Sequence, residues 1–327
     1  MVVLHHSKCR TTSQDVHQGA DDMSQATSRR AVVRVPSGPR SIEIVDVPLA
    51  EPGPAEIRVK IAAAAINPVD VGVADGVFHR LGLVHQPDHT GLGWDFAGTV
   101  DAAGPGVELP VGTRVAGFID GFDRDHGSHA EHLVVAATNA AVVPDSMDLV
   151  EAATVPLNAT AAAQLVNLLG EAPSKARRLL VTGAAGAVGA HVAVLAQDRG
   201  WQVTGMARAA DEPFVRGIGV DFATEPGHGW DAVADAGALQ EHALRAVRDD
   251  GRFVGVQPAS RLPEERGIAV EVLVAHPDGA LLAGLLARVA TGELPARVHS
   301  VAPLDEAADA YEAMAKGSVR GRIVLVP

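Results

Sequence analysis

Three glycines spaced three residues apart lie between an apolar run and a helix-like run of the sequence. Gly183, Gly186 and Gly189 follow RLLVT, a buried-strand pattern, and apolar side chains then recur at helical spacing up to Arg199. Glycines at a strand-to-helix turn allow a tight bend and let a pyrophosphate reach the backbone N–H groups of the new helix. Glycines also serve in ordinary turns, but the flanking strand and helix favour a dinucleotide site. The predicted pyrophosphate-binding residues are Gly183, Ala184, Ala185, Gly186, Ala187, Val188 and Gly189.

The end of the following strand-like run indicates which dinucleotide the site binds. In WQVTGMARAADE the run reaches Ala207 and then Arg208. An NAD site has Asp or Glu here, about 20 residues after the glycines, on the ribose hydroxyls. A carboxylate would repel a 2′-phosphate, whereas a guanidinium binds one through two hydrogen bonds. We therefore predict NADP(H), with Arg208 on the phosphate. Two alternatives stay open: Arg208 is a solvated surface residue, or Asp211 binds the ribose of NADH.

The hydrophobic pattern divides the chain into segments of different structure. Residues 1–29 are polar and lack periodicity, which predicts a disordered leader. Residues 30–150 contain short runs with Val and Ile at alternate positions between Pro/Gly turns, which is typical of a compact β domain. Strand and helix patterns alternate in residues 151–275, which predicts a doubly wound parallel sheet with helices on both faces. Residues 276–327 add two helices and a closing strand. The predicted fold class is α/β.

Two finer predictions concern the third segment. ALQEHALRAVRDDG (238–251) indicates one helix, and DLVEAATVPLNATAAAQLVNLLG indicates a helical stretch whose second half is capped by Asn158. Ligands of parallel sheets bind beyond the carboxyl ends of the strands. This rule places Asp235 and Ala236 near the cofactor ribose, and the last two residues of the strand pattern RFVGVQ near the nicotinamide. The latter are Val256 and Gln257.

Composition excludes several classes of protein. The chain of 327 residues is 47% hydrophobic and 20% charged, the balance of a globular protein. Its net charge of −13 argues against nucleic acid and anionic membranes as partners. Cys9 is the single cysteine, so no disulfide framework or Cys-rich zinc site forms. No apolar run reaches the roughly 20 residues of a membrane span, and MVVLHHSKCR lacks the apolar core of a signal peptide. The sequence predicts a cytoplasmic protein.

Motifs from about residue 30 to the end of the chain occur together in a characteristic order. They are AAINPVDVGVADG, GWDFAGTVDAAGPGV, GSHAEHLVV, VPLNATAAAQL, TGAAGAVGAHVAVLA, WDAVADAG, DDGRFVGV and VRGRIVLVP. In this order they resemble the medium-chain dehydrogenase/reductase superfamily, and specifically its zinc-free quinone oxidoreductase branch. The resemblance implies a GroES-like catalytic domain that the chain leaves and re-enters, with a Rossmann domain between. It also implies a cleft for NADPH and an electrophilic small molecule, and a homodimer, for which GIAVEVLVA offers an edge strand that pairs with its twin.

The residues at the family's zinc positions cannot bind zinc. Asn67 in NPVD stands where metal-using relatives have a ligand cysteine, and Trp94 in GWDFAG replaces the ligand histidine. The third ligand would fall near Pro156. Zinc needs nitrogen or sulfur ligands in a tetrahedral arrangement, and these residues supply none. We predict no metal.

The loss of the metal restricts the chemistry that the resemblance implies. Reducing an isolated ketone concentrates charge on one oxygen and needs a Lewis acid or a proton donor, and the single tyrosine, Tyr311, lies in a terminal helix pattern. Hydride addition to a quinone or an enone delocalises the charge, so hydrogen-bond donors and the exclusion of water suffice. We predict an NADPH-dependent quinone or enone reductase. The alternatives are a metal-free NADP-dependent alcohol or carbonyl dehydrogenase and a non-catalytic NADPH-binding protein.

The resemblance also assigns roles to individual residues. The Asn67 amide would orient the substrate carbonyl or the nicotinamide ribose; alternatively, it caps the turn before Pro68. The Thr160 hydroxyl matches a family position that faces the nicotinamide; alternatively, it bonds to the preceding helical turn. Arg322 resembles the lysine of the family's Gly-Lys ending and would add charge near the phosphates.

Overall fold

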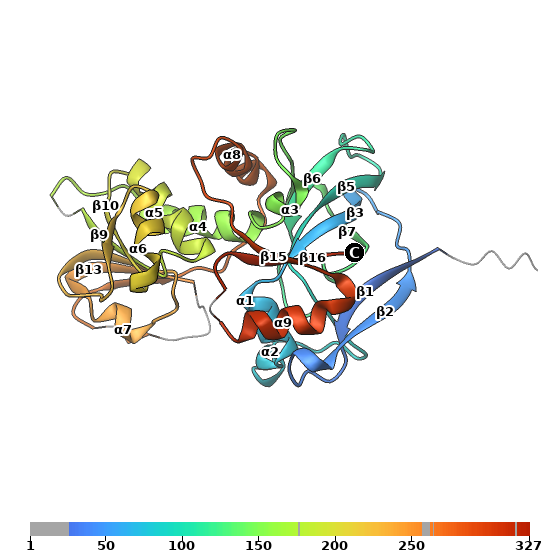
Figure 1. Ribbon diagram of the computed structural model, residues 1–327, viewed down its shortest axis with the longest axis horizontal. Helices are drawn as coiled ribbons and strands as arrows, with labels where there is room; N and C mark the ends of the chain where they lie inside the picture. The colour runs from blue at the N-terminus through green and yellow to red at the C-terminus, as the bar shows by residue number, and fades with distance from the viewer. Residues whose placement is uncertain (1–25, 176, 257–261, 264, 318) are drawn as a thin grey trace, which may run out of the picture.

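The computed structural model describes residues 26–327 except 176, 257–261, 264 and 318. The described residues form a three-stranded sheet, a larger sheet that mixes strands from both ends of the chain, and a six-stranded parallel sheet. Figure 1 shows the parallel sheet with its helices on the left and the other two sheets on the right. The predicted α/β class is confirmed, with a β-rich part and a part built on a doubly wound parallel sheet.

The larger sheet is built around β3, whose sequence EIRVKIAAAA alternates along its first half. Ile57, Val59 and Ile61 are buried because successive side chains of a strand point to opposite faces. β3 pairs antiparallel with β5, β7 and β16. The strands of this sheet are β15 (Val298–Pro303), β16 (Arg322–Val326), β3 (Glu56–Ala65), β5 (Asp95–Ala103), β6 (Arg114–Phe118) and β8 (Ala140–Val142) in spatial order, with β7 (His132–Ala136) also on β3.

Both ends of the described chain are tied into this β-rich part. β16 pairs with β3, and β15 runs parallel to β16. At the other end, β1 (Thr27–Val33) pairs with β2 (Ile42–Pro48) and with β4 (Thr90–Gly91). Residues 27–29, which we expected in the disordered leader, therefore belong to a strand whose backbone is paired with β2. The rest of that leader, up to residue 25, lies outside the described residues.

The six-stranded sheet is parallel throughout. Its strands in spatial order are β11 (Asp221–Ala223), β10 (Gln202–Met206), β9 (Arg178–Thr182), β12 (Trp230–Asp235), β13 (Val247–Gly255) and β14 (Ala269–Val272). The chain winds outward in one direction from β9 to β11 and in the other from β12 to β14. The order reverses between β9 and β12, and ligands of such sheets bind beyond the carboxyl ends of the strands at this point.

Both faces of the parallel sheet are covered, as the near-continuous apolar run RLLVT requires. Leu179 and Val181 face a core cluster that includes the helices α4 (Pro156–Leu169) and α5 (Ala187–Asp198). Leu180, which points the opposite way, packs with Phe253 and with α7 (Glu241–Leu244). α4 also contacts β5 and β6 of the larger sheet, so this helix joins the two parts of the molecule.

The predicted helix over 238–251 is wrong in extent. Only α7 is helical, and β13 begins at Val247. The residues around α7 explain the difference, because Ala238, Gln240 and Asp250 have positive φ angles, which a right-handed helix does not allow. Asn158 does not cap a helix either: α4 begins with Pro156 in its first turn, where proline is favoured, and Asn158 lies inside the helix.

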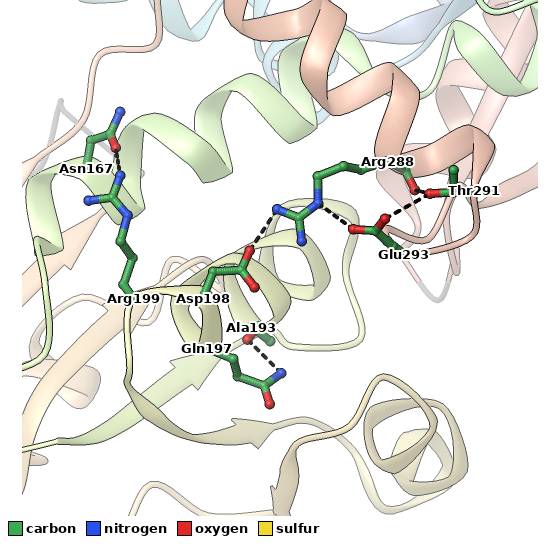
Figure 2. Close-up of polar contacts among 8 residues, drawn as sticks. All are labelled: Asn167, Ala193, Gln197, Asp198, Arg199, Arg288, Thr291 and Glu293. Carbon is green, nitrogen blue, oxygen red and sulfur yellow. Dashed lines mark hydrogen bonds and ion pairs between the residues drawn. The ribbon is translucent and has the colours of Figure 1, made fainter.

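The α8 helix (Gly279–Ala290) is fastened to α5 by an arginine (Figure 2). Arg288 donates to Asp198 at 2.7 Å and to Glu293 at 3.0 Å. Arg199, just after α5, donates to Asn167 of α4 at 2.7 Å. These contacts are exposed, so each stabilises the fold by at most about 1 kcal/mol. They add polar links between helices that pack together mainly through the apolar core.

The other helices are short. None of the described helices is long and apolar enough to cross a bilayer. They are α1 (Pro68–Ala74), α2 (Val77–Arg80), α3 (Leu149–Ala152), α6 (Glu212–Gly217) and α9 (Ala307–Ala315), with 3-10 turns η1 (Pro39–Ser41), η2 (Ala137–Asn139), η3 (Ala209–Asp211) and η4 (Leu304–Glu306).

Candidate active site

The turn from β9 to α5 is packed too tightly for side chains at two of its three glycines. Gly183 has a φ of +62°, and a Cβ there would lie 2.9 Å from the Cα of Gly237 in the loop after β12. A Cβ on Gly189 would lie 2.2 Å from the Gly183 carbonyl oxygen. Gly186 is exposed and is the N-cap residue of α5. Two glycines thus bring the helix and both loops together, while the third leaves the N-terminus of the helix open.

The N-terminus of α5 presents backbone N–H groups that no side chain caps. The amides of Ala187, Val188 and Gly189 belong to the first turn, where an α-helix supplies no partner. The side chains of Ala184 and Ala185 are buried in the core, so these residues offer a ligand only their backbone. An anion here would gain from both the amides and the helix dipole.

The Asp235 carboxylate is hydrogen-bonded to the loops between β9 and β12, where the strand order reverses, and does not face a ribose. The side chain is fully buried, and it accepts hydrogen bonds from Thr182 Oγ1 at 2.5 Å and from the N–H groups of residues 239–240 at 3.0 and 2.7 Å. Thr182 Oγ1 accepts in turn from Gly237 N at 2.9 Å. The carboxylate therefore ties the loop after β9 to the loop after β12, which contains Ala236.

Of two charged residues just after β10, Asp211 is in an ion pair and Arg208 has no partner among the described residues. Arg208 is exposed, and its side chain has no hydrogen-bond or ion-pair partner among the described residues. Asp211 is buried, and its carboxylate accepts from Arg320 Nε at 2.5 Å. The ion pair with Arg320 disfavours the alternative in which Asp211 binds the ribose of NADH.

Arg297 is a site residue that the sequence analysis missed. Its guanidinium lies 3.9 Å from the centre of the Phe214 ring and donates a hydrogen bond to the carbonyl of Ala185 in the glycine turn. Burial lowers the pKa of Arg297, Asp211 raises it, and the neighbouring Arg320 lowers it further. Arg297 comes from the segment before β15, far away in sequence, so no local pattern could have revealed this contact.

A buried polar network surrounds Asn67, which is the N-cap residue of α1. Asn67 Nδ2 donates to Asp95 Oδ2 at 2.8 Å, and Asn67 Oδ1 accepts from Arg322 Nε at 2.9 Å and from Asn158 Nδ2 at 3.3 Å. Arg322 Nη2 also donates to Asn158 Oδ1 at 2.5 Å. All four side chains are at least nine-tenths buried. The network joins α1, β5, α4 and β16.

The network corrects two predictions. Both atoms of the Asn67 amide group are engaged within the protein, so the capping alternative describes its position and no free amide faces a substrate. Arg322, predicted beside the cofactor phosphates, is only 8% exposed and uses its guanidinium on Asn67 and Asn158. The reason is topological: β16 lies next to β3, whose end leads into Asn67.

Burial dominates the electrostatics of this network. Desolvation raises the pKa of Asp95 to about 7, against the lowering effect of its hydrogen bonds from Asn67 and Leu157 N. Asp70 likewise has a pKa raised to about 7 by burial, although its Oδ2 accepts from Asn67 N at 2.7 Å. Desolvation lowers the pKa of Arg322 to about 10, so this side chain remains protonated at neutral pH. The pKa values of the Asp70 and Asp95 carboxyls therefore lie close to neutral pH.

The donor set at the family's zinc position does not fit zinc. The Asn67 amide is engaged, Pro156 starts α4, and Trp94 packs among Phe118 and Phe122 with ring-centre distances of 6.5 and 5.7 Å. Within the part of the chain that the structure describes, no group of three or more His, Cys, Asp or Glu side chains is arranged to hold a metal ion.

Thr160 is fully buried inside α4, and its hydroxyl has no partner among the described residues. The alternative role, a hydrogen bond to the preceding helical turn, is therefore not seen. Of the two residues predicted near the nicotinamide after β13, Val256 is half-buried against the core, whereas Gln257 lies outside the described residues. The predicted contacts of Thr160 and Val256 with the nicotinamide remain predictions.

Tyr311 is paired in the interior, although its sequence position suggests isolation at a terminal helix. Its hydroxyl lies 2.8 Å from His129 Nδ1, and His129 Nε2 lies 3.3 Å from the Ala65 carbonyl oxygen. A carbonyl only accepts, so Nε2 carries the proton and the tyrosine donates to Nδ1. Burial lowers the pKa of His129 to about 4 and raises that of Tyr311. Both side chains are fully buried, which keeps the tyrosine from acting as an exposed proton donor.

Two family models match the chain. Residues 53–145 match the alcohol dehydrogenase GroES-like domain, and residues 209–325 match the zinc-binding dehydrogenase family. With the two-part fold and the glycine turn already described, these matches show that the chain belongs to the medium-chain dehydrogenase/reductase superfamily. Members of this superfamily are oxidoreductases that use a nicotinamide cofactor.

Individual similar proteins cover different parts of the chain. A mycocerosic acid synthase-like polyketide synthase of Mycobacterium tuberculosis is 31% identical over 90% of this chain, which spans only 15% of that protein. The trans-enoyl reductase opdC of Penicillium oxalicum is 39% identical over 40% of this chain and 35% of its own length. The quinone oxidoreductase structure from Coxiella burnetii has a TM-score of 0.82 over 92% of this chain and 100% of that chain, and at 21% identity this likeness shows the fold alone.

Proposed function

We propose that this chain is a zinc-independent oxidoreductase that transfers a hydride from NADPH to a quinone or an α,β-unsaturated carbonyl. The observation that carries the proposal is the buried network of Asn67, Asp95, Asn158 and Arg322. Hydrogen-bonded side chains occupy the position that holds a zinc ligand in metal-using relatives. The chain thus keeps the architecture of the superfamily while its residues are unsuited to the ion.

The geometry of the nucleotide crevice supports NADPH as the cofactor, which supplies the hydride when bound. The open N-terminus of α5 would hold the pyrophosphate through the amides of residues 187–189. Beside it, none of the described residues pairs with the Arg208 guanidinium, and Arg297 and Arg320 bring two more positive charges around Asp211. This excess of positive charge favours a 2′-phosphate over the bare ribose of NADH.

The proposed substrate class follows from which polar groups are already paired. Reducing an isolated carbonyl builds charge on one oxygen, which requires a proton donor or a Lewis acid. The Asn67 amide is engaged, and Tyr311 is buried against His129. A quinone or an enone spreads the developing charge and needs less local stabilisation. The trans-enoyl reductase among the similar sequences supports the same class.

A panel of acceptors tests the proposal directly. The purified protein, dialysed against EDTA, would be mixed with NADPH and quinones, enones, enoyl thioesters, aldehydes or simple ketones, and the absorbance of NADPH followed. We expect turnover with the conjugated acceptors and at least tenfold less with the ketones. Dominant oxidation of a simple secondary alcohol with NADP⁺ would instead indicate an alcohol dehydrogenase. Tight NADPH binding without turnover on any acceptor would indicate a non-catalytic binding protein.

We also propose that the protein is a homodimer. The segment predicted to pair with its twin contains β14, which forms one edge of the parallel sheet. Its free edge carries backbone groups that can pair with a second copy. Val272 is only half-buried on this strand, and Val274 just beyond it is 55% exposed, so dimerisation would also cover apolar surface.

A further inference from the structure

The loop at residues 236–240 connects β12 to α7 and lies against the glycine turn of the nucleotide crevice. A Cβ on Gly183 would lie 2.9 Å from the Cα of Gly237, and Gly237 N donates to Thr182 Oγ1 at 2.9 Å. Gly237 and Ala238 are exposed. Ligands of parallel sheets bind beyond the carboxyl ends of the strands. This loop therefore borders the space that a coenzyme would occupy.

Two residues of the loop have backbone conformations that L-amino acids disfavour. Ala238 has a φ of +54°, and Gln240 has a φ of +56° with a ψ of −121°. In these regions the Cβ of an L-residue is crowded by its own backbone, whereas glycine adopts them freely. Backbone strain of this kind persists only where the surrounding structure imposes it, and it is concentrated at sites of function.

The Asp235 carboxylate supplies the contacts that impose this conformation. It is fully buried and accepts hydrogen bonds from Leu239 N at 3.0 Å and from Gln240 N at 2.7 Å. It also accepts from Thr182 Oγ1 at 2.5 Å, which ties the loop to the end of β9. If the loop moved away, the buried carboxylate would lose two of its donors. Hydrogen bonds thus hold the loop against the torsional preference of its own residues.

We propose that residues 236–240 form a latch for coenzyme exchange, which Asp235 holds closed and which the strain at Ala238 and Gln240 biases toward opening. The inference rests on the proposed binding of a nicotinamide coenzyme in this crevice. Opening would move the loop away from the glycine turn, and release of a bound coenzyme would follow. Asp235 is a positioning residue, because its carboxylate contacts the loop and acts on the coenzyme only through it.

Variants that relieve the strain and a variant that removes the hold should change coenzyme release in opposite directions. In Ala238→Gly and in Gln240→Gly the positive φ costs little, so the closed latch is favoured and NADPH should dissociate at least about threefold more slowly. Asp235→Asn replaces an accepting oxygen with a donor, so NADPH should dissociate at least about tenfold faster. Stopped-flow fluorescence during displacement of NADPH by excess NADP⁺ measures these rates.

Ala55→Gly is the matched control for Ala238→Gly. Ala55 is also exposed and has a φ of +62°, but it lies in the turn before β3 in the β-rich part. Both variants should raise the free energy of unfolding measured by urea denaturation, because glycine relieves the same kind of strain in each. Only Ala238→Gly should slow coenzyme release. A purely structural role of the loop would change stability and leave the release rate unaltered.

Unchanged release in both glycine variants of the loop would overturn the proposal, and so would slower release in Asp235→Asn. The glycine variants decide the matter if Asp235→Asn fails to fold, which circular dichroism would show. The same rates are measured with NADH. A wild type that binds NADH in place of NADPH would refute the proposed coenzyme, yet slower NADH release in Ala238→Gly would still support the latch. A wild type that binds neither coenzyme would overturn both proposals.

Discussion

At the residue scale, the proposed preference for NADPH depends on a few charged side chains beside β10. Asp211 is neutralised by Arg320, whereas Arg208 points its charge into solvent with no partner among the described residues, and Arg297 lies over Phe214 against the glycine turn. The carboxylate that would favour NADH is thus occupied, and the groups that would favour a phosphate are available.

Removing one of these charges should weaken NADPH selectively. Arg208→Ala or Arg297→Ala is expected to raise the Kd of NADPH about tenfold to a hundredfold, since each removes a charge-assisted hydrogen bond to the 2′-phosphate. The Kd of NADH should change much less. Fluorescence titration with both coenzymes measures the ratio. Arg216→Ala, which breaks an exposed pair with Glu212 on α6, serves as the control. An equal loss of NADPH and NADH affinity would contradict a phosphate contact.

His129 makes stability depend on pH in a defined direction. Its pKa is about 4 in the folded protein and about 6.5 when unfolded, because burial disfavours the charged ring. The unfolded state therefore binds an extra proton below pH 6.5. The stability that the neutral ring contributes is complete above pH 6.5 and is lost as the pH falls toward 4, by up to about 3 kcal/mol.

The variant His129→Gln cannot titrate, so its deficit in free energy of unfolding relative to the wild type should shrink between pH 7.5 and pH 5. Urea denaturation at the two pH values measures this change. The control is His228→Gln, which removes an exposed histidine. A constant deficit for His129→Gln would show that folding does not lower the pKa of this ring.

At the scale of elements, the crevice depends on how closely α5 packs on the turn that precedes it. The Gly189 position has no room for a Cβ, since the Gly183 carbonyl would be 2.2 Å away. Asp235 and Thr182 brace the loop that faces this turn. The helix N-terminus and the adjacent loops are therefore closely packed and hydrogen-bonded to one another.

Gly189→Ala is expected to displace α5, lowering the free energy of unfolding by about 1–3 kcal/mol through overpacking and weakening NADPH binding at least tenfold. Chemical denaturation and coenzyme titration measure the two effects. The matched control is Gly284→Ala in α8, where a Cβ would meet nothing within 4 Å. That change should be neutral or stabilise the protein by up to about 1 kcal/mol. Wild-type stability and binding in Gly189→Ala would refute the tight packing.

At the scale of the whole molecule, the chain returns from the parallel sheet to the larger sheet that contains its early strand β3. β16 lies beside β3, which supports the predicted return of residues 276–327 to the catalytic domain. β14 forms one edge of the parallel sheet, and its free side is the proposed dimer contact.

A charge on that edge should break the proposed dimer. Val272→Lys places an ammonium group on β14, where it would oppose its own copy across the two-fold axis. Size-exclusion chromatography with light scattering is expected to give a dimer for the wild type and a monomer for the variant. Val111→Lys, at a 65% exposed valine outside the parallel sheet, should remain dimeric. A monomeric wild type would refute the proposed dimer.

The amino-acid sequence by itself determined the α/β class, the parallel sheet and the glycine turn. These depend on patterns that repeat over a few residues: the apolar run of β9, the helical spacing in α5 and the glycines between them. The prediction of a helix over 238–251 was wrong because a local pattern does not include the tertiary contacts of that segment. Its apolar spacing suits a helix, but positive φ angles at Ala238, Gln240 and Asp250 interrupt it, and the pairing of β13 with its neighbours outweighs local propensity.

Only the tertiary structure decided which polar groups remain available. Asn67, Asp95 and Arg322 stand in separate motifs, and nothing local shows that β16 delivers a guanidinium to the asparagine. Arg297 and Tyr311 likewise meet partners more than 100 residues away. A buried hydrogen-bonding group must find a partner wherever the fold brings one. Residue types therefore state what chemistry is possible, while packing determines which of these groups can still reach a ligand.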